Sequence, residues 1–247
     1  MTIFVFLFGA LFTSFYSLIG MRIPNKASIH GRSQCDQCHE IIPWYALIPI
    51  FGWFIIKGRC VKCESKVSIK YPIYEVIGGL LFAVGYFVLQ SNLVEFAAYS
   101  VFISLMIIVT VSDIEYQIVP DIILLIFLPL ILTLRIAEPI EGYLNVLLGG
   151  FLGFLFMFLI AWYGQKRFKK EALGGGDIKL YFLIGLFLGA RIVFLSLFFA
   201  SLLGIILGRI VMKKMNPIPF VPFIFFGSIL AYFFGYTLLD WYMGLFF

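Results

Sequence analysis

The chain has 247 residues, of which 62% are hydrophobic and only 13% charged, and its mean hydropathy is +1.05. This composition excludes an ordinary soluble domain and is typical of an integral membrane protein. The formal net charge of +5 would also suit a nucleic-acid-binding protein. However, 30 phenylalanines and long apolar runs argue against that class, so we expect the excess of Lys and Arg to set the membrane topology.

Apolar segments near the length of a membrane-spanning helix follow one another along the chain. They cover residues 3–20, 73–90, 94–112, 119–136, 143–163, 178–190, 192–211 and 220–238. Because a spanning helix needs about 20 apolar residues, the sequence predicts an all-α polytopic membrane protein with about eight transmembrane helices. The first segment lacks a basic start and runs into Arg22, so we expect a retained helix rather than a cleaved signal peptide.

Basic residues are unevenly divided between the two sides of this predicted membrane protein. If the loop over residues 21–72 faces the cytoplasm, alternation of the spans places every Lys and Arg except Arg135 and Arg191 on the cytoplasmic side. Cytoplasmic loops are enriched in Lys and Arg. The charge pattern therefore predicts that both chain termini lie outside.

All four cysteines lie in that first loop, as two CxxC pairs. Cys35 and Cys38 form the first pair, and Cys60 and Cys63 form the second after 21 intervening residues. Two such pairs suit a structural zinc ion held by four thiolates, with the metal stabilising a loop that has little core. The alternative is two unrelated dithiols or disulfides, and a cytoplasmic location argues against structural disulfides.

The stretch between the two cysteine pairs is unusually apolar for a loop. Residues 43–53 read PWYALIPIFGW. We expect this stretch either to pack under the metal lobe or to lie at the bilayer interface, where Trp and Tyr are favoured. A substrate-binding role is a weaker alternative.

Two carboxylates close or open apolar segments at the same predicted membrane face. Asp113 extends one segment into the headgroup region, and Asp177 follows three glycines at the start of another. Taken singly, Asp113 could belong to a polar turn and Asp177 could be a helix N-cap. Together they suggest a pair that shares one proton, in which the ionised member activates water and the neutral member binds a scissile carbonyl. Acids at membrane depth are costly and usually functional.

The glycines before Asp177 have a mechanical explanation as well. Without Cβ atoms, Gly174, Gly175 and Gly176 can act as a hinge and allow an extended substrate backbone to approach closely.

At these motifs the sequence resembles the bacterial type IV prepilin peptidases, which are GxGD membrane aspartyl proteases. Residues 174–179 resemble the GxGD motif with its following Lys, and residues 113–121 resemble the other acid motif. Residues 32–75 are similar to the N-terminal zinc domain, and residues 14–24 to the end of the first helix. The chain departs from many members at Thr13 and Ser17, where they have Gly and Asn. It looks most like the variant of Gram-positive competence and pilus systems.

The resemblance implies a bifunctional enzyme of the bacterial cytoplasmic membrane. It would cut the leader of prepilin or pseudopilin precursors after a Gly at the cytoplasmic face, and then methylate the new N-terminus with S-adenosylmethionine as donor. Its partners would be these precursors, through their hydrophobic helix, and membrane lipid. Residues 1–75 would form the first span and the zinc domain associated with methyl transfer, and residues 76–247 the peptidase domain.

The resemblance also assigns roles to individual residues. Asp113 and Asp177 would be catalytic, and the four cysteines would bind zinc. Motif support would come from Gly174, Gly176, Lys179, Glu115 and Asp121. For methyl transfer, which must take place between the zinc loop and the membrane, the candidates are Ser14, Arg22 and Glu75.

Two alternatives remain open at this point. One is another GxGD peptidase that acts on signal peptides or preflagellins. The other, from a different class, is a transporter or a zinc-stabilised scaffold, which should carry ionisable residues near the middle of several spans. The acids of this chain lie at one face instead, which favours the peptidase.

Overall fold

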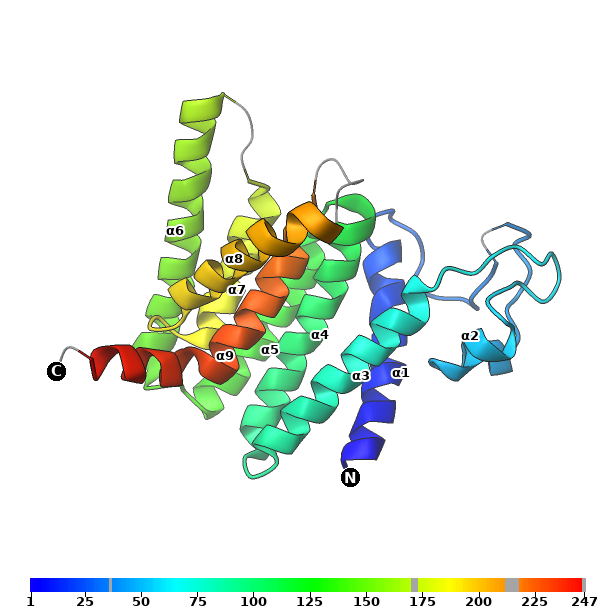
Figure 1. Cartoon of the computed structure of the whole chain (residues 1–247), viewed down its shortest axis with the longest axis horizontal. Coiled ribbons are helices and arrows are strands. Elements are labelled where there is room, and N and C mark those ends of the chain that lie inside the picture. The colour runs from blue at the N-terminus through cyan, green and yellow to red at the C-terminus, as the bar shows by residue number, and fades with distance from the viewer. Residues whose placement is uncertain (36, 170–172, 212–217, 246–247) are drawn as a thin grey trace. The chain divides into compact units, whose positions relative to one another are not determined.

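The computed structural model describes residues 1–35, 37–169, 173–211 and 218–245 (Figure 1). The helices of this part are α1 (Thr2–Arg22), η1 (Trp44–Leu47), α2 (Phe51–Ile55), α3 (Lys70–Leu89), α4 (Leu93–Tyr116), α5 (Asp121–Ala137), α6 (Tyr143–Phe168), α7 (Gly175–Leu188), α8 (Val193–Val211) and α9 (Val221–Met243). The described residues form no β-strand, only two isolated bridges, Gln34 with Ile41 and Arg59 with Lys66. The prediction of an all-α membrane protein is confirmed.

Eight of these helices correspond to the apolar segments of the sequence, but they differ in length. Among the described residues, α1, α3, α4, α6 and α9 are long and apolar enough to cross a membrane. Helix α7 has only 14 residues, about 21 Å at 1.5 Å per residue. It starts after Gly174 and ends before Gly189, whose φ of +82° stops the helix. The count of eight spans therefore stays a prediction.

The charge asymmetry of the sequence can be followed at the helix ends. Lys166 and Arg167 lie in the last turn of α6, whereas Arg135 lies in the last turn of α5 and Arg191 follows α7. The predicted orientation in the membrane remains a prediction. Three lysines that contribute to it lie outside the described residues: Lys170, Lys213 and Lys214.

The chain forms two compact units, residues 1–111 and 112–247, and the division falls within α4. In the first unit, α1 and α3 pack antiparallel through small residues, which allow apolar helices to approach closely. A Cβ added to Gly78 would lie 1.8 Å from Thr13 Oγ1. The Thr13 hydroxyl donates to the Gly9 carbonyl at 2.7 Å, so this buried threonine is satisfied within its own helix.

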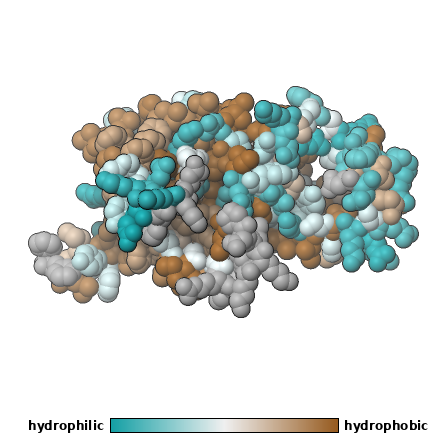
Figure 2. Space-filling model, turned by 90° about the horizontal axis from the view of Figure 1, so that it is seen from above, coloured by the Kyte–Doolittle hydropathy of each residue, from teal (hydrophilic) through white to brown (hydrophobic). Residues whose placement is uncertain are grey.

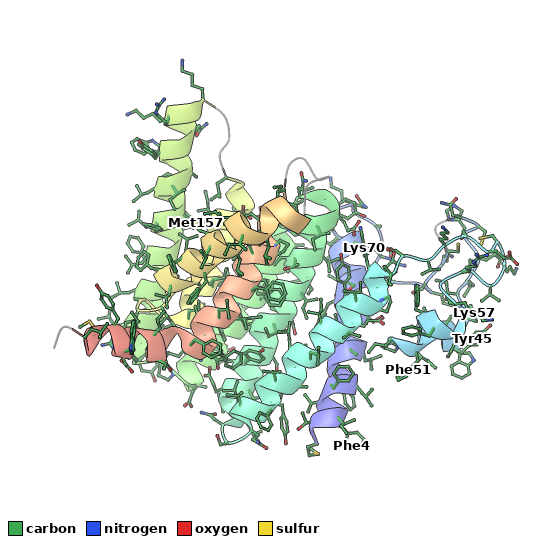
Figure 3. All side chains as sticks on the ribbon, viewed as in Figure 1. Phe4, Tyr45, Phe51, Lys57, Lys70 and Met157 are labelled. Carbon is green, nitrogen blue, oxygen red and sulfur yellow. The ribbon has the colours of Figure 1, made fainter. Side chains whose placement is uncertain are left out.

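A lobe of loops and short helices, residues 23–69, completes the first unit. Hydrophilic side chains gather over it at the right of Figure 2. Within the lobe, residues 41–56 form an uncharged segment that contains η1 and α2, which we call the apolar arm. Its inner side packs on the lobe, where Trp53 Nε1 donates to the Val67 carbonyl at 3.1 Å. Its outer side is exposed, at 77% for Trp44 and 58% for Phe51. Tyr45 and Phe51 of this segment are labelled in Figure 3.

The second unit is built from closely packed helix pairs. Helix α7 meets α6 backbone to backbone, since a Cβ on Gly185 would lie 2.0 Å from the Gly149 carbonyl oxygen. Helix α9 meets α8 in the same way, because a Cβ on Gly227 would lie 2.5 Å from the Ala200 nitrogen. These contacts fix the axes of α7 and α9, whose first residues build the candidate site described below.

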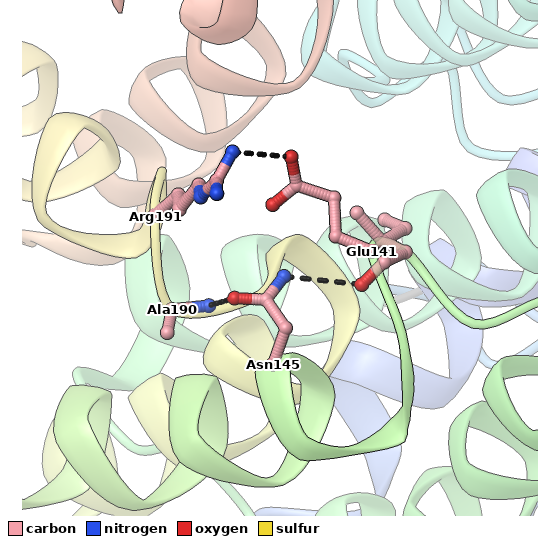
Figure 4. A network of polar contacts seen from close by, with 5 residues as sticks. Glu141, Asn145, Ala190 and Arg191 are labelled. Atoms are coloured by element: carbon pink, nitrogen blue, oxygen red, sulfur yellow. Dashed lines mark hydrogen bonds and ion pairs between the residues drawn. The ribbon is translucent and has the colours of Figure 1, made fainter.

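A polar network lies at the C-terminal end of α7 (Figure 4). Asn145 Nδ2 donates to the Ile140 carbonyl at 3.0 Å, and Asn145 Oδ1 accepts from the Ala190 N–H at 3.2 Å. Arg191 pairs with Glu141 at 2.7 Å. One side chain thereby ties the loop before α6 to the loop after α7, far from the N-terminal turn of α7.

Candidate functional site

Asp113 lies in the last turn of α4, within the second unit, and is only 6% exposed. Its Oδ2 accepts the backbone N–H of Val221, the first residue of α9, at 2.9 Å. The amide of Phe220 is a further backbone partner. The free amides at a helix N-terminus are natural partners for a carboxylate. Residues 108 positions apart thereby hold this side chain in one orientation.

The turn that follows Asp113 is also held by a buried side chain. The hydroxyl of Ser112, which is fully buried, donates to the Ile118 carbonyl. Gln117 adopts a left-handed conformation with φ +56°, which reverses the chain before α5. The end of α4 is therefore fixed by its own turn as well as by α9.

Asp177 lies in the first turn of α7 and is half-buried. Gly174 is the N-cap of the helix, and its carbonyl accepts the Asp177 N–H at 3.1 Å. The Asp113 carboxylate acts electrostatically on that of Asp177. The two predicted catalytic acids therefore lie in one compact unit, in the last turn of α4 and the first turn of α7, close enough for their charges to interact.

The three glycines before Asp177 have different surroundings. A Cβ added to Gly176 would lie 2.7 Å from Val119 Cβ, so this position requires glycine for packing. At Gly175 a Cβ would meet nothing within 4 Å, and at Gly174 only the Asp177 carboxylate. The first two glycines therefore leave open backbone beside the acid, whereas the third lets α7 approach the chain before α5.

This difference predicts unequal effects of two alanine substitutions. Gly176→Ala should destabilise the protein by about 1–3 kcal/mol, as overpacked sites do, and should lower peptidase activity by displacing Asp177. Gly175→Ala is the matched control and should leave thermal stability unchanged or slightly raised, because alanine favours helix. Thermal unfolding of the purified protein in detergent measures the stability difference. Equal stability of the two variants would contradict the packing role of Gly176.

The remaining acids of the motif region differ in exposure: Asp121 is exposed and Glu115 is half-buried. Lys179 Nζ contacts both carboxylate oxygens of Asp121 at 2.8 Å, which joins the first turn of α7 to the first residue of α5. Both side chains are more than half exposed. Glu115 is half-buried in the last turn of α4.

Asp121→Asn should therefore reduce cleavage much less than Asp113→Asn. Exposed ion pairs contribute about 0–1 kcal/mol, so we expect a change in rate of no more than about tenfold. Initial rates of precursor cleavage for the two variants in parallel test the ranking, with Asp121→Glu as the charge-retaining control. A loss of activity in Asp121→Asn as large as in Asp113→Asn would place Asp121 among the catalytic groups.

An apolar pocket of about 480 Å³ lies next to this ion pair, between α5, α6 and α7. Its walls are Asp121, Leu124, Leu125, Leu128, Phe151, Phe154, Lys179, Phe182 and Leu183. On α7 the wall residues occupy positions 179, 182 and 183, a face turned away from Asp177. The pocket is therefore not the place where the two acids meet.

The four cysteines form a compact cluster in the first unit. Their sulfur atoms all lie within 4.8 Å of one another, with Cys35 and Cys63 at 3.8 Å and Cys38 and Cys60 at 3.9 Å. Four thiolates around a tetrahedral zinc at about 2.3 Å would be about 3.8 Å apart. The cysteines are free rather than disulfide-bonded. The cluster could therefore hold a metal ion, and its geometry fits a tetrathiolate site.

The two CxxC pairs are built alike. In the first pair, the Cys35 N–H donates to the Glu40 backbone carbonyl, and the His39 N–H donates to the Cys35 carbonyl. In the second pair, the Cys60 N–H donates to the Ser65 carbonyl, and the Glu64 N–H donates to the Cys60 carbonyl. His39 and Glu64 both have φ near +56°, at +57° and +55°. This internal repeat is not evident from the residue types alone, because the shared feature is a backbone conformation.

The hydroxyl of Ser65 lies beside two of the sulfurs, 3.5 Å from Cys35 and 3.1 Å from Cys63. Its hydrogen bond lowers the pKa of the Cys35 thiol to about 6, and the pKa of Cys63 is lowered for the same reason. Ser65 therefore favours the thiolate form that a metal ion requires.

Of the methyl-transfer candidates, the structure brings two together and leaves the third apart. Glu75 Oε2 accepts the Ile50 N–H at 2.6 Å, and the Ser14 hydroxyl is its other hydrogen-bond partner. Arg22 lies at the end of α1 and donates to the Ser28 carbonyl at 3.0 Å. The contact between Ile50 and Glu75 was not visible in the sequence, since nothing marks Ile50 as a donor.

Two family models match separate parts of the chain. Residues 7–89 match the bacterial peptidase A24 N-terminal domain, and residues 100–209 match the type IV leader peptidase family. These ranges contain the cysteine cluster and both acids, respectively. No solved structure matches the chain.

Several curated relatives carry the name prepilin leader peptidase/N-methyltransferase. The protein of Bacillus subtilis (strain 168) is 38% identical over 97% of this chain and 96% of its own length. The protein of Myxococcus xanthus is 31% identical over 83% of this chain and 62% of its own length, and that of Aeromonas salmonicida (strain A449) is 28% identical over 86% and 75%. The chain therefore belongs to the type IV leader peptidase family.

Proposed function

We propose that this protein is a membrane aspartyl endopeptidase that removes the leader peptide of type IV prepilin or pseudopilin precursors. The observation that carries the proposal is that Asp113, held by the Val221 amide, and Asp177 in the first turn of α7 lie near enough for their charges to interact. Membership of the leader peptidase family and the names of the relatives support the same activity.

The geometry supports a hydrolytic mechanism with a division of labour between the two acids. The ionised carboxylate takes a proton from a water molecule, and the neutral carboxyl donates a hydrogen bond to the scissile carbonyl. The water oxygen bonds to the carbonyl carbon, the carbon–nitrogen bond of the scissile peptide then breaks, and the proton taken from the water passes to the leaving amine. The α9 amide fixes one oxygen of Asp113, and the open backbone at Gly174 and Gly175 leaves room for an extended substrate.

We further propose that the cut follows a Gly at the cytoplasmic face of a bacterial cytoplasmic membrane, with both chain termini outside. The distribution of Lys and Arg over the loops supports this orientation. The precursor would lie with its hydrophobic helix in the bilayer, so that only its leader reaches the acids. We propose residues 76–247 as the peptidase domain.

Zinc is the metal that we propose for the cysteine cluster, with a structural role. The four sulfurs fill a tetrahedral shell, so no position is left open for a substrate or a reactive water. Within residues 1–75, the cysteines 35, 38, 60 and 63 would hold the ion, and Ser65 would favour the thiolate form of Cys35 and Cys63.

N-methylation of the new N-terminus is the second activity that we propose, because the relatives carry it in their names. S-adenosylmethionine would supply the methyl group. Ser14 on α1 and Glu75 on α3 contact each other, and Glu75 also accepts from Ile50 of the lobe, so this polar group lies where the lobe meets the spans. One carboxylate and one hydroxyl do not make a complete site for this donor, so we assign no step to them; Arg22 lies apart from both.

Co-expression with a candidate prepilin, followed by the intact mass of the purified product, tests both activities. The expected product lacks its leader up to a Gly and carries one added methyl group. A precursor expressed without the enzyme is the control. Unchanged precursor mass beside the folded, membrane-inserted enzyme would contradict the peptidase, whereas a cleaved but unmethylated product would contradict only the methyltransferase.

A further inference from the structure

The apolar arm exposes an unusual amount of hydrophobic surface. Its sixteen residues, 41–56, contain no charged side chain. Exposure reaches 77% at Trp44, 64% at Phe54, 58% at Phe51 and 54% at Ile55. Contiguous apolar surface of this kind on a water-soluble lobe would mark an interaction site. The question is what covers it.

A strained contact fastens the arm to the membrane helices. Ile50 has φ +65°, which is a genuine outlier for a β-branched residue. Its N–H donates to the half-buried carboxylate of Glu75, in the second turn of α3, and Ser14 on α1 contacts the same carboxylate. Strain of this kind persists only where the surroundings impose it. The position of the arm beside α3 is therefore specified rather than incidental.

Glu75, where the arm is attached, lies further along the membrane span than the charged ends of α1 and α3. Lys70 begins α3 and Arg22 ends α1, and antiparallel packing brings these ends to the same side. Charged ends of spans lie at the headgroups. Glu75 comes five residues after Lys70, about 7.5 Å further into the span at 1.5 Å per residue. In Figure 3, Tyr45 and Phe51 are likewise displaced from Lys70 toward the end of the unit marked by Phe4.

The exposed surface of the arm continues the lipid-facing surface of the spans. Beside the attachment point, Ile73 and Ile77 of α3 are 46% and 36% exposed, and Phe15 of α1 is 51% exposed. Charge returns at both ends of the arm, at Glu40 before it, which pairs with Lys62, and at Lys57 and Arg59 after it. An apolar segment with Trp and Tyr, a basic flank and a depth of several ångströms fits the interface of a bilayer.

We propose that the apolar arm inserts into the membrane leaflet at the C-terminal end of α1, with the lipid itself as its partner. Trp44, Phe51 and Phe54 enter the boundary between headgroups and acyl chains, and Lys57 reaches back to the phosphates. The Ile50–Glu75 hydrogen bond sets the depth. The cysteine lobe is thereby held against the membrane surface by protein and lipid together.

Depth-dependent quenching of Trp44 fluorescence tests this proposal. The chain has four tryptophans, and Trp53→Phe, Trp162→Phe and Trp241→Phe leave only Trp44. In vesicles of phosphatidylcholine and phosphatidylglycerol, lipids brominated near the headgroup should quench Trp44 at least twofold more than lipids brominated near the chain end. Aqueous acrylamide should quench it weakly. The matched control carries Trp44→Phe and Val61→Trp in the same background. Its tryptophan should be quenched strongly by acrylamide and weakly by either brominated lipid, because position 61 lies in a charged loop.

Strong acrylamide quenching of Trp44 without quenching by brominated lipid would place the arm in water and overturn the proposal. Resistance to both quenchers would also overturn it, since the arm would then be covered by protein.

A measurement on the unaltered chain avoids any effect of the substitutions on folding. With a photoactivatable acyl-chain probe in the same vesicles, peptides covering residues 41–56 should be labelled and those covering 59–66 should not, and the reverse pattern would refute lipid contact.

Discussion

Replacing either Asp113 or Asp177 by asparagine should reduce leader cleavage by at least about a thousandfold. General acid–base catalysis contributes about 10²–10⁴-fold for each group, and in the proposed mechanism the pair works as a unit, with one member ionised and the other neutral. An asparagine keeps the size of the side chain but can neither take a proton from water nor donate a carboxyl proton to the scissile carbonyl. Initial cleavage rates of a purified precursor in detergent measure the loss.

The double variant provides a sharper criterion. If the acids act together, Asp113→Asn combined with Asp177→Asn should be about as inactive as either single variant, because neither acid functions alone. Val221 donates through its backbone, so the hydrogen bond to position 113 can be kept by the asparagine Oδ1, and folding should be preserved. Thermal unfolding checks that the variants are intact. Cleavage retained within tenfold by either well-folded single variant would remove the proposed mechanism.

Loss of one cysteine ligand should abolish stoichiometric metal binding and unfold the lobe. Structural zinc sites contribute about 10–16 kcal/mol to folding in small zinc-binding peptides, and residues 23–69 have little other core. We expect wild-type protein to contain one zinc ion per chain and Cys35→Ser to contain almost none, with faster proteolysis within the lobe. Precursor cleavage should fall only in part, because both proposed catalytic acids belong to the other compact unit.

Ser65→Ala is the matched control for this loss, since Ser65 contacts two sulfurs without being a ligand. The variant should retain zinc at neutral pH. In the wild type, the Ser65 hydroxyl lowers the pKa of the Cys35 thiol to about 6. Removing it raises that pKa, so metal should be released at a higher pH than in the wild type as the solution is acidified. Elemental analysis across a pH series measures the shift, and wild-type protein free of zinc would contradict the site altogether.

Cys35→Ser changes the first compact unit and Asp177→Asn changes the second, so their effects on the two proposed activities and on the metal can be compared. An effect of Cys35→Ser on methylation but not on cleavage would agree with a methyl-transfer role of residues 1–75. Asp177→Asn should have no effect on zinc content. The two activities and the metal can therefore be followed independently in one set of variants.

Much of the site was predictable because its chemistry depends on residue type. Four cysteines in two CxxC pairs predict a metal cluster whatever the rest of the chain does, and the structure brings their sulfurs within 4.8 Å. Asp113 and Asp177 are conspicuous because each interrupts apolar sequence at a predicted membrane boundary. The number of spans was less predictable, since hydropathy measures composition and cannot tell that glycines confine α7 to 14 residues.

The amino-acid sequence by itself determined the membrane class, the helical segments and the cysteine cluster and singled out two candidate acids, because these follow from composition, periodicity and local spacing. Only the tertiary structure decided what holds them. The Val221 amide reaches Asp113 across 108 residues, Gly176 but not Gly175 is closed off by packing, and Glu75 accepts from Ile50 while Arg22 stays apart. Such contacts are made by backbone N–H groups and by van der Waals contact, which every kind of residue can provide. The residue type therefore does not predict them, and they form only once the helices have packed.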